Sequence, residues 1–240
     1  MCTVTFTPTP DGYYLAMNRD ERIARGPSGP PEVIQYGSTA AIYPRDVEGG
    51  TWIAANSGGI TFAVLNWNTG GVMQPKTRSR GCVIPALINA ISARKAKEEL
   101  NNFQLEGILS FRLVGLFPAE KEITEWRWNQ NSLEHELSGW CSRQWCSSSL
   151  SDTQATLRRG LAYARAEHES DKGSLVWLRR LHASHDQEEG RFSTCVHRTD
   201  VKTLSYAELI CTTDAVVLNY LARSPCSANQ AMQSVSIARS

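Results

Sequence analysis

The sequence predicts an α+β sandwich in which antiparallel sheets are covered by helices. Segments with strand periodicity come in pairs joined by short turns, whereas the helical segments fall into two blocks between them. Alternating strand and helix units would build a parallel sheet, so this order favours hairpins with helices layered outside. The chain has 240 residues, of which 41% are hydrophobic and 20% charged, as in ordinary folded proteins. No Gly/Ser/Pro linker divides it, and residues 1–240 are therefore expected to form one domain.

A first hairpin is expected at the start of the chain. Residues 2–8 and 13–19 alternate between polar and apolar side chains, and residues 9–12 supply a turn. This register places the apolar side chains of both strands on one face of the hairpin. A shift of one residue in the pairing would move the apolar side chains of one strand to the opposite face. It makes three pairs across the hairpin: Cys2 with Arg19, Val4 with Met17, and Phe6 with Leu15.

A second hairpin and the first helix follow. A turn rich in Asn, Ser and Gly separates strands at residues 51–55 and 60–66, and the second strand is almost wholly apolar, which indicates a central position in a sheet. After a polar loop at residues 67–79, apolar side chains recur at helical spacing over residues 82–95. Residues 97–101 continue this helix or begin another.

The rest of the chain repeats the same order of strands, helices and strands. The proline-rich residues 26–31 are expected to be a surface loop. The further elements predicted by periodicity are strands at 110–117, 122–128 and 143–148, helices at 153–167 and 175–185, and strands at 194–197, 203–209 and 215–220.

Charge and composition exclude several classes of protein. Lys plus Arg total 25 and Asp plus Glu total 24, so the net charge of +1 provides no basic field for nucleic acid. No apolar run is long enough to span a membrane, and no export signal is found at the start. The odd number of cysteines, seven, then favours reduced thiols and a cytoplasmic location.

No metal or other cofactor is expected from the spacing of ligand-type residues. Cys141 and Cys146, with His135 nearby, match no zinc pattern and are interpreted as structural. His182 and His185 lie three residues apart on a predicted helix, a spacing compatible with metal, but no carboxylate pattern surrounds them. His197 is interpreted as a structural strand residue.

Position 2 has unusual chemistry. Methionine aminopeptidases remove Met1 when the next residue is small, and the new α-amine would belong to the same residue as the Cys2 thiol. Reference pKa values of about 7.7–8.0 for the amine and about 8.5 for the thiol make proton exchange nearly thermoneutral. Arg19 across the hairpin is expected to depress the pKa of the thiol, and Asp20 could accept hydrogen bonds from the amine. The alternative is a small hydrophobic residue opposite a salt-bridged arginine.

Three further side chains are candidates for the same site. Trp52 and Arg80 could line a substrate entrance, or could be a core residue and a residue at a helix start. Glu21 could be a partner of Arg19 or Arg22, or a solvated charge.

Four motifs at the start of the chain resemble a known family. They occur in order over residues 1–81: Met1-Cys2-Thr3-Val4, Asn18-Arg19-Asp20-Glu21, Gly49-Gly50-Thr51-Trp52 and Ser79-Arg80-Gly81. Together they resemble the Asn-Arg-Asp-Glu family, which includes the transport and Golgi organisation protein two. Residues 146–153 and 194–205 resemble later blocks of that family more loosely.

The resemblance implies a fold and roles for residues. The family is similar to N-terminal-nucleophile cysteine hydrolases such as bile salt hydrolase and penicillin V acylase, which implies an αββα sandwich. Cys2 matches the nucleophile of these enzymes, and Arg19 and Asp20 match its flanking residues, which the acylases space further apart. Asn66, after Leu65, matches an oxyanion donor and could instead be a strand-end cap. Ser148 stands where the acylases have a second Asn.

Three functions therefore remain open. The first is an amidohydrolase that cleaves a non-peptide carbon–nitrogen bond of a small amide or acyl substrate through a Cys2 acyl-enzyme. The second is a non-catalytic carrier or trafficking protein for a lipid, acyl-CoA or haem-like ligand. The third is a degenerate fold that only binds a partner. The oligomeric state is not determined by the sequence.

Overall fold

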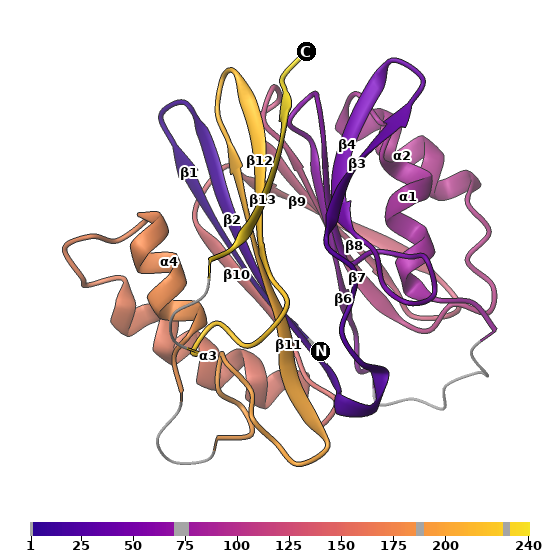
Figure 1. The fold of residues 1–240 in the computed structure, drawn as a ribbon. Coiled ribbons are helices and arrows are strands. Elements are labelled where there is room, and N and C mark those ends of the chain that lie inside the picture. The colour runs from indigo at the N-terminus through magenta and orange to yellow at the C-terminus, as the bar shows by residue number, and fades with distance from the viewer. Residues whose placement is uncertain (1, 70–76, 186–189, 228–230) are drawn as a thin grey trace.

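The computed structural model describes residues 2–69, 77–185, 190–227 and 231–240, and these form two antiparallel sheets with helices on their outer faces (Figure 1). Met1 and residues 70–76 of the expected polar loop lie outside this part of the chain. The predicted α+β sandwich of antiparallel sheets is confirmed.

The first sheet has six strands. In spatial order they are β10 (Arg143–Ser147), β1 (Cys2–Thr9), β2 (Gly12–Arg22), β11 (Val201–Cys211), β12 (Ala215–Leu221) and β13 (Gln233–Ala238). The second sheet has seven strands in chain order: β3 (Pro31–Tyr36), β4 (Thr39–Pro44), β5 (Ile53–Asn56), β6 (Thr61–Asn66), β7 (Phe111–Phe117), β8 (Glu122–Trp128) and β9 (Leu133–Gly139). The first sheet thus joins the start of the chain to its end.

Helices cover the outer face of each sheet. The helices α1 (Val83–Leu87) and α2 (Ala93–Asn102) lie against the seven-stranded sheet, and α3 (Asp152–Ala166) and α4 (Leu175–His182) lie against the six-stranded one (Figure 1). Two short 3-10 helices, η1 (Ile23–Arg25) and η2 (Arg80–Cys82), connect other elements. Within the described residues, no helix has the length and apolar character needed to cross a bilayer.

The register of the first hairpin is the predicted one. Cys2 pairs with Arg19, Val4 with Met17 and Phe6 with Leu15. The apolar side chains of this face enter the main core, which both sheets build together. The opposite face is polar but equally buried, because α3 and α4 cover it, and Thr3 and Thr5 have no exposed area.

The prediction of one helix over residues 82–95 is wrong. Residues 80–82 form η2, α1 ends at Leu87, and a separate helix α2 begins at Ala93. Ser92 explains the break, because its side chain accepts a hydrogen bond from the backbone N–H of Lys95 at 3.1 Å and so caps a new helix. Ser151 and Ser174 cap α3 and α4 in the same way.

The predicted strand at residues 194–197 is also wrong. This segment makes only an isolated bridge, between His197 and Lys202, before β11 begins. The Val196 carbonyl accepts from the backbone N–H of Thr203 in β11 at 2.9 Å, whereas the Thr194 carbonyl accepts from Asn18 Nδ2 at 2.8 Å and the preceding Ser193 carbonyl from Arg159 Nε at 3.0 Å. Side chains distant in sequence thus take up carbonyls at the start of this segment, and the pairing with β11 is too short to form a strand.

The sequence does not predict four of the strands. Three of them, β3, β9 and β13, are edge strands with mostly exposed or half-exposed residues. Such strands lack the alternation of buried and exposed side chains on which a prediction depends. The fourth, β4, pairs with β3 in a hairpin directly after the loop at residues 26–30.

A buried histidine connects the first hairpin to α4. His182 Nδ1 lies 3.1 Å from Asn18 Oδ1, and Nε2 lies 2.9 Å from Thr5 Oγ1. Because Asn18 Nδ2 already donates to two carbonyls, Asn18 Oδ1 accepts and Nδ1 carries the proton of a neutral ring. Burial, with the nearby charge of Arg159, lowers the pKa of His182 to about 3.

This histidine is expected to weaken the fold in acid. The unfolded chain takes up a proton near the ordinary pKa of 6.5 and the folded chain does not do so until about pH 3, so stability is full above pH 6.5 and falls as the pH drops through this window. We expect the free energy of unfolding, measured by urea denaturation, to lose up to about 1.4 kcal/mol per pH unit from this group. His182→Gln should flatten the slope. The exposed His135→Gln should keep it, and equal slopes for His182→Gln and the unsubstituted chain would contradict the assignment.

Candidate active site

A small pocket lies where the N-terminal strand of one sheet faces the other sheet. Its volume is about 80 Å³, well below the 300–1,000 Å³ usual for a pocket that encloses a drug-sized ligand. Its walls contain seven of the side chains that the sequence singled out: Cys2, Arg19, Asp20, Glu21, Trp52, Asn66 and Arg80. Asn18 and Ser148 do not line it.

Strand pairing places Arg19 beside Cys2, and the opposite sheet supplies an aromatic ring. The Arg19 guanidinium carbon lies 4.4 Å from the centre of the Trp52 ring, a cation–π distance. Both side chains are buried, with 5% and 6% of their surface exposed. Arg19 Nη1 and Trp52 Nε1 have no hydrogen-bond partner among the described residues. Two buried N–H donors of the pocket walls are therefore free to bind an acceptor.

The Cys2 thiol does not have the depressed pKa expected from Arg19. Burial raises the pKa of Cys2, and the lowering effect of the Arg19 charge does not compensate for it. The thiol is therefore protonated at neutral pH and needs a base before it can act as a nucleophile.

A buried arginine that the sequence did not indicate holds the strand start from behind. Arg159 of α3 has 1% of its surface exposed. Its Nη1 donates to the Cys2 carbonyl at 3.1 Å and to Thr3 Oγ1 at 2.8 Å, and its Nη2 lies 3.2 Å from Asp20 Oδ2. The sequence offers one weak indication of this role: Arg159 lies on the same buried face of α3 as Ala155 and Ala166, where a charged residue is unexpected.

Asp20 is fixed on both carboxylate oxygens. Arg159 binds Oδ2, and the Thr203 hydroxyl donates to Oδ1 at 2.6 Å. Thr203 also accepts from the backbone N–H of Val196 at 2.8 Å, which connects Asp20 to the segment before β11. The side chain of Asp20 is thus buried and paired through both oxygens at the wall of the pocket.

The serine beside the Cys2 backbone is Ser147 and not Ser148. The backbone N–H of Cys2 donates to Ser147 Oγ at 2.9 Å, because these two residues pair in the ladder of β1 and β10. Ser148 belongs to the turn into α3, where its N–H donates to Asp152 Oδ1 at 2.6 Å. The sequence could not indicate this, because nothing in it shows that β10 pairs with β1.

The two glycine motifs of the sequence meet at the pocket. A Cβ on Gly50 would lie 2.8 Å from the backbone of Gly81, and the N–H of Thr51 donates to the Gly81 carbonyl at 3.1 Å. The backbones approach too closely for any side chain at Gly50. This contact sets Trp52 and Arg80 on neighbouring parts of the wall.

Acidic and basic side chains line the same pocket. Arg25 lies 3.5 Å from Glu21 Oε2 and 3.0 Å from Asp46 Oδ2. Burial alone would raise the pKa of Glu21, but the backbone N–H of Arg22 and the nearby positive charges outweigh it and leave the pKa below its ordinary value. Glu21 is therefore a carboxylate at neutral pH and an ion-pair partner in this wall.

The arrangement has the parts needed for nucleophilic acyl chemistry. A buried thiol, a cation beside it and two N–H donors without partners among the described residues line one small volume, where they can stabilise a developing negative charge. Asn66 at the end of β6 adds a carboxamide to the same wall.

The fold class follows from comparison of the whole chain with solved structures. A cysteine-to-alanine mutant of conjugated bile acid hydrolase from Clostridium perfringens matches with a TM-score of 0.57 at 12% identity, covering 98% of this chain and 92% of the hydrolase. An arginine-to-leucine variant of that enzyme gives 0.60 at 12% identity with the same coverage. Penicillin V acylase from Agrobacterium tumefaciens gives 0.53 at 10% identity, covering 92% and 83%. The fold is that of the N-terminal-nucleophile cysteine hydrolases.

The family follows from the sequence. The model of the family Transport and Golgi organisation 2 matches residues 1–206, and the chain belongs to this family. The resemblance read from the four N-terminal motifs is thereby confirmed. No match was found among curated protein sequences.

Loss of the buried ion pair should destabilise the whole fold. Arg159→Met leaves the Asp20 carboxylate buried without its cation, and removal of one partner of such a pair costs about 3–5 kcal/mol. Adding Asp20→Asn should restore part of this stability, because the uncompensated charge disappears. Urea denaturation followed by tryptophan fluorescence measures both changes.

The exposed Arg165→Met on the same helix is the matched control, and we expect it to change stability by less than about 0.5 kcal/mol. An Arg159→Met chain as stable as this control would show that the ion pair contributes nothing.

Proposed function

We propose that this protein is an amidohydrolase whose nucleophile is Cys2 after removal of Met1. The observation that carries the proposal is the burial of the Cys2 thiol beside Arg19, in a pocket whose walls offer N–H donors without acceptors. The shared fold supports it, since both related enzymes are by name a hydrolase and an acylase. One of them was solved with a cysteine at position 2 replaced by alanine.

The proposed first half-reaction forms an acyl-enzyme. The Cys2 nitrogen, which Ser147 Oγ holds at 2.9 Å, would be the free α-amine after Met1 is removed, and it takes the proton of the thiol. The sulfur attacks the amide carbon, and Arg19, Trp52 and Asn66 donate to the developing oxyanion. The ammonium then returns its proton to the nitrogen of the leaving amine as the carbon–nitrogen bond breaks.

The second half-reaction restores the enzyme. Water loses a proton to the same amine and attacks the thioester, the carbon–sulfur bond breaks, and the sulfur recovers the proton. Because burial raises the pKa of Cys2, the amine is the base that this scheme requires. The pocket of about 80 Å³ fits the reacting amide and a short substituent, so most of a larger substrate would lie outside it.

We further propose that the chain acts as a single domain in the cytoplasm, on small amide or acyl molecules and not on nucleic acid. The near-balance of 25 basic and 24 acidic residues supports the exclusion of nucleic acid. The seven cysteines, all free in the structure, support a reducing compartment.

Trapping of the acyl-enzyme tests the proposal. The protein is incubated with a panel of acyl amides and lactams, and intact mass followed by peptide mapping locates any adduct. We expect loss of Met1, an acyl adduct on Cys2 and amine release that Cys2→Ala abolishes, a loss of at least about 1,000-fold. Cys146→Ser, a change at another buried cysteine, should keep activity. Retention of Met1 would block the amine and refute the mechanism.

A carrier function is the second candidate, and one observation favours it. A larger cavity of about 420 Å³ lies between α3 and α4, away from Cys2. Its lining combines apolar Leu161 and Leu181 with the basic side chains of Arg158 and Arg165, whereas Arg180 and Glu169, which also line it, pair with each other. This combination suits a ligand with an acyl chain and an anionic head, such as an acyl-CoA.

Binding titration distinguishes the two functions. If the protein is a carrier, calorimetry with a long-chain acyl-CoA should give the same affinity for the unsubstituted chain and for Cys2→Ala, and no acylated Cys2 should form. Arg165→Ala should weaken binding by about 10-fold, the effect of losing one charge-assisted hydrogen bond. Absence of binding to the unsubstituted chain rules the carrier function out for this ligand.

A further inference from the structure

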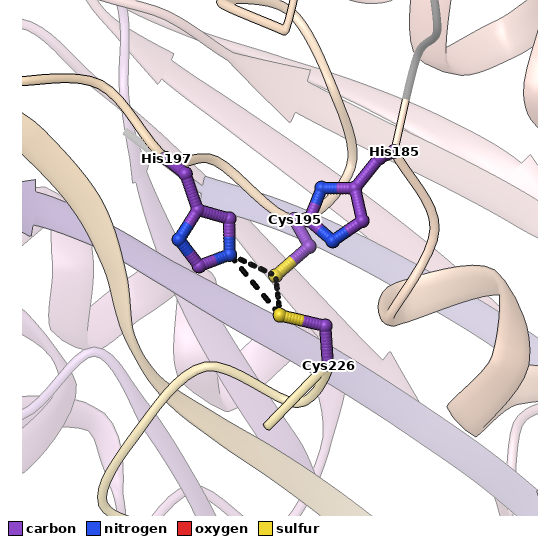
Figure 2. Close-up of side chains that lie close together, drawn as sticks. All are labelled: His185, Cys195, His197 and Cys226. Atoms are coloured by element: carbon purple, nitrogen blue, oxygen red, sulfur yellow. Dashed lines mark hydrogen bonds between the residues drawn. The ribbon is translucent and has the colours of Figure 1, made fainter. Parts of the chain in front are cut away.

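Two cysteines and two histidines meet at one point outside the Cys2 pocket. They are His185, Cys195, His197 and Cys226, and their possible ligand atoms all lie within 4.8 Å of one another (Figure 2). They come from three separate segments: the end of the stretch after α4, the stretch before β11, and the turn after β12. Among the described residues, no other group of His, Cys, Asp and Glu has this geometry.

The spacing of three of the four ligand atoms fits a tetrahedral metal ion, and the fourth, on His185, lies within 4.8 Å of them. Zinc lies about 2.3 Å from sulfur and about 2.0–2.1 Å from nitrogen, which in a tetrahedron separates two sulfurs by about 3.8 Å and a sulfur and a nitrogen by about 3.5 Å. Here the two sulfurs lie 3.6 Å apart, and His197 Nε2 lies 3.5 Å from Cys195 Sγ and 3.1 Å from Cys226 Sγ. The ring of His185 lies 5.1 Å from that of His197, measured between centres.

We propose that His185, Cys195, His197 and Cys226 bind a structural zinc ion. Two thiolates and two neutral imidazoles form one of the common ligand sets of structural zinc, and the two thiolate charges balance the charge of Zn²⁺. With four protein ligands the zinc ion has no coordination position left for water, so the site would stabilise the fold and would not activate water for catalysis. This proposal differs from the expectation from sequence that no metal binds. The four ligands belong to three separate segments of the chain and come together only in the folded structure.

A disulfide between Cys195 and Cys226 explains the cluster less well. The two sulfurs are 3.6 Å apart and both cysteines are free. In a disulfide the two sulfurs lie about 2.0 Å apart, and a disulfide would not account for the two imidazole rings beside them. Figure 2 shows the rings of His185 and His197 on either side of the sulfurs, as ligands of a shared ion would lie.

The proposed ion would fix the segment that supports Arg159 and Asn18. Cys195 is buried, and its N–H donates to the Ser184 carbonyl at 3.0 Å, which ties the stretch before β11 to the end of α4. Directly before it, the carbonyl of Ser193 accepts from Arg159 and that of Thr194 accepts from Asn18. A metal at Cys195 would therefore hold these two carbonyls in place behind Cys2, whatever reaction Cys2 performs.

Metal analysis of the full-length protein tests the inference. Protein purified without chelators is analysed by plasma mass spectrometry, and chelator-treated, reduced protein is titrated with zinc and with cobalt(II). We expect about one zinc per chain, a thiolate-to-cobalt charge-transfer band typical of tetrahedral sulfur ligands, and a lower melting temperature after zinc is removed.

Variants locate the site. Cys226→Ser and His197→Gln should reduce bound zinc by at least about 10-fold, since each removes one of four ligands. Cys141→Ser, at an exposed cysteine, and His135→Gln, at an exposed histidine, are the matched controls and should keep the full amount.

Two results would overturn the proposal. One is reduced, folded protein that takes up neither zinc nor cobalt at stoichiometric concentrations. The other is zinc bound equally by Cys226→Ser and the unsubstituted chain. A Cys195–Cys226 disulfide found by peptide mapping, in protein that takes up no metal after reduction, would identify a redox pair in place of the metal site.

Discussion

The arrangement of the site depends on the buried ion pair between Arg159 and Asp20. Arg159 enters from α3, on the outer side of the six-stranded sheet, and its guanidinium contacts the carbonyls of Cys2 and Ser147 as well as the Asp20 carboxylate. One side chain therefore joins β10, β1, β2 and a helix. Because an unpaired buried charge is so costly, the three strands cannot shift against each other without breaking several charge-assisted bonds together.

The opposite wall is set by backbone contact instead of charge. Gly50 and Gly81 touch without side chains, and this brings the residues that follow and precede them to the pocket. Trp52 then meets the guanidinium of Arg19 from the other sheet. One wall of the pocket therefore belongs to a sheet stabilised by ionic contacts, and the other to two loops that pack closely together. Both walls leave little space between them, which explains the small volume.

The segment before β11 connects the pocket to the proposed metal site. Its carbonyls accept hydrogen bonds from Arg159 and Asn18, and Cys195 and His197 follow directly. In place of the strand that the local sequence predicts, this segment forms only an isolated bridge to β11. A bound ion would supply the order that strand pairing does not, and the Arg159 contacts would depend on it.

The sequence alone determined the first hairpin, its register and the neighbourhood of Cys2 and Arg19, because a short turn and a period of two residues are local properties. The sequence also indicated the family, because four short motifs of that family occur in the same order along residues 1–81. Only the tertiary structure decided the order β10-β1-β2-β11, and with it the roles of Ser147 and Arg159 and the convergence of the His and Cys ligands. Asp20 and Arg159 lie 139 residues apart in the chain, and no local pattern encodes a contact between such distant residues. The sequence does not predict the edge strands β3, β9 and β13, because side chains that stay mostly exposed do not have to alternate between apolar and polar residues.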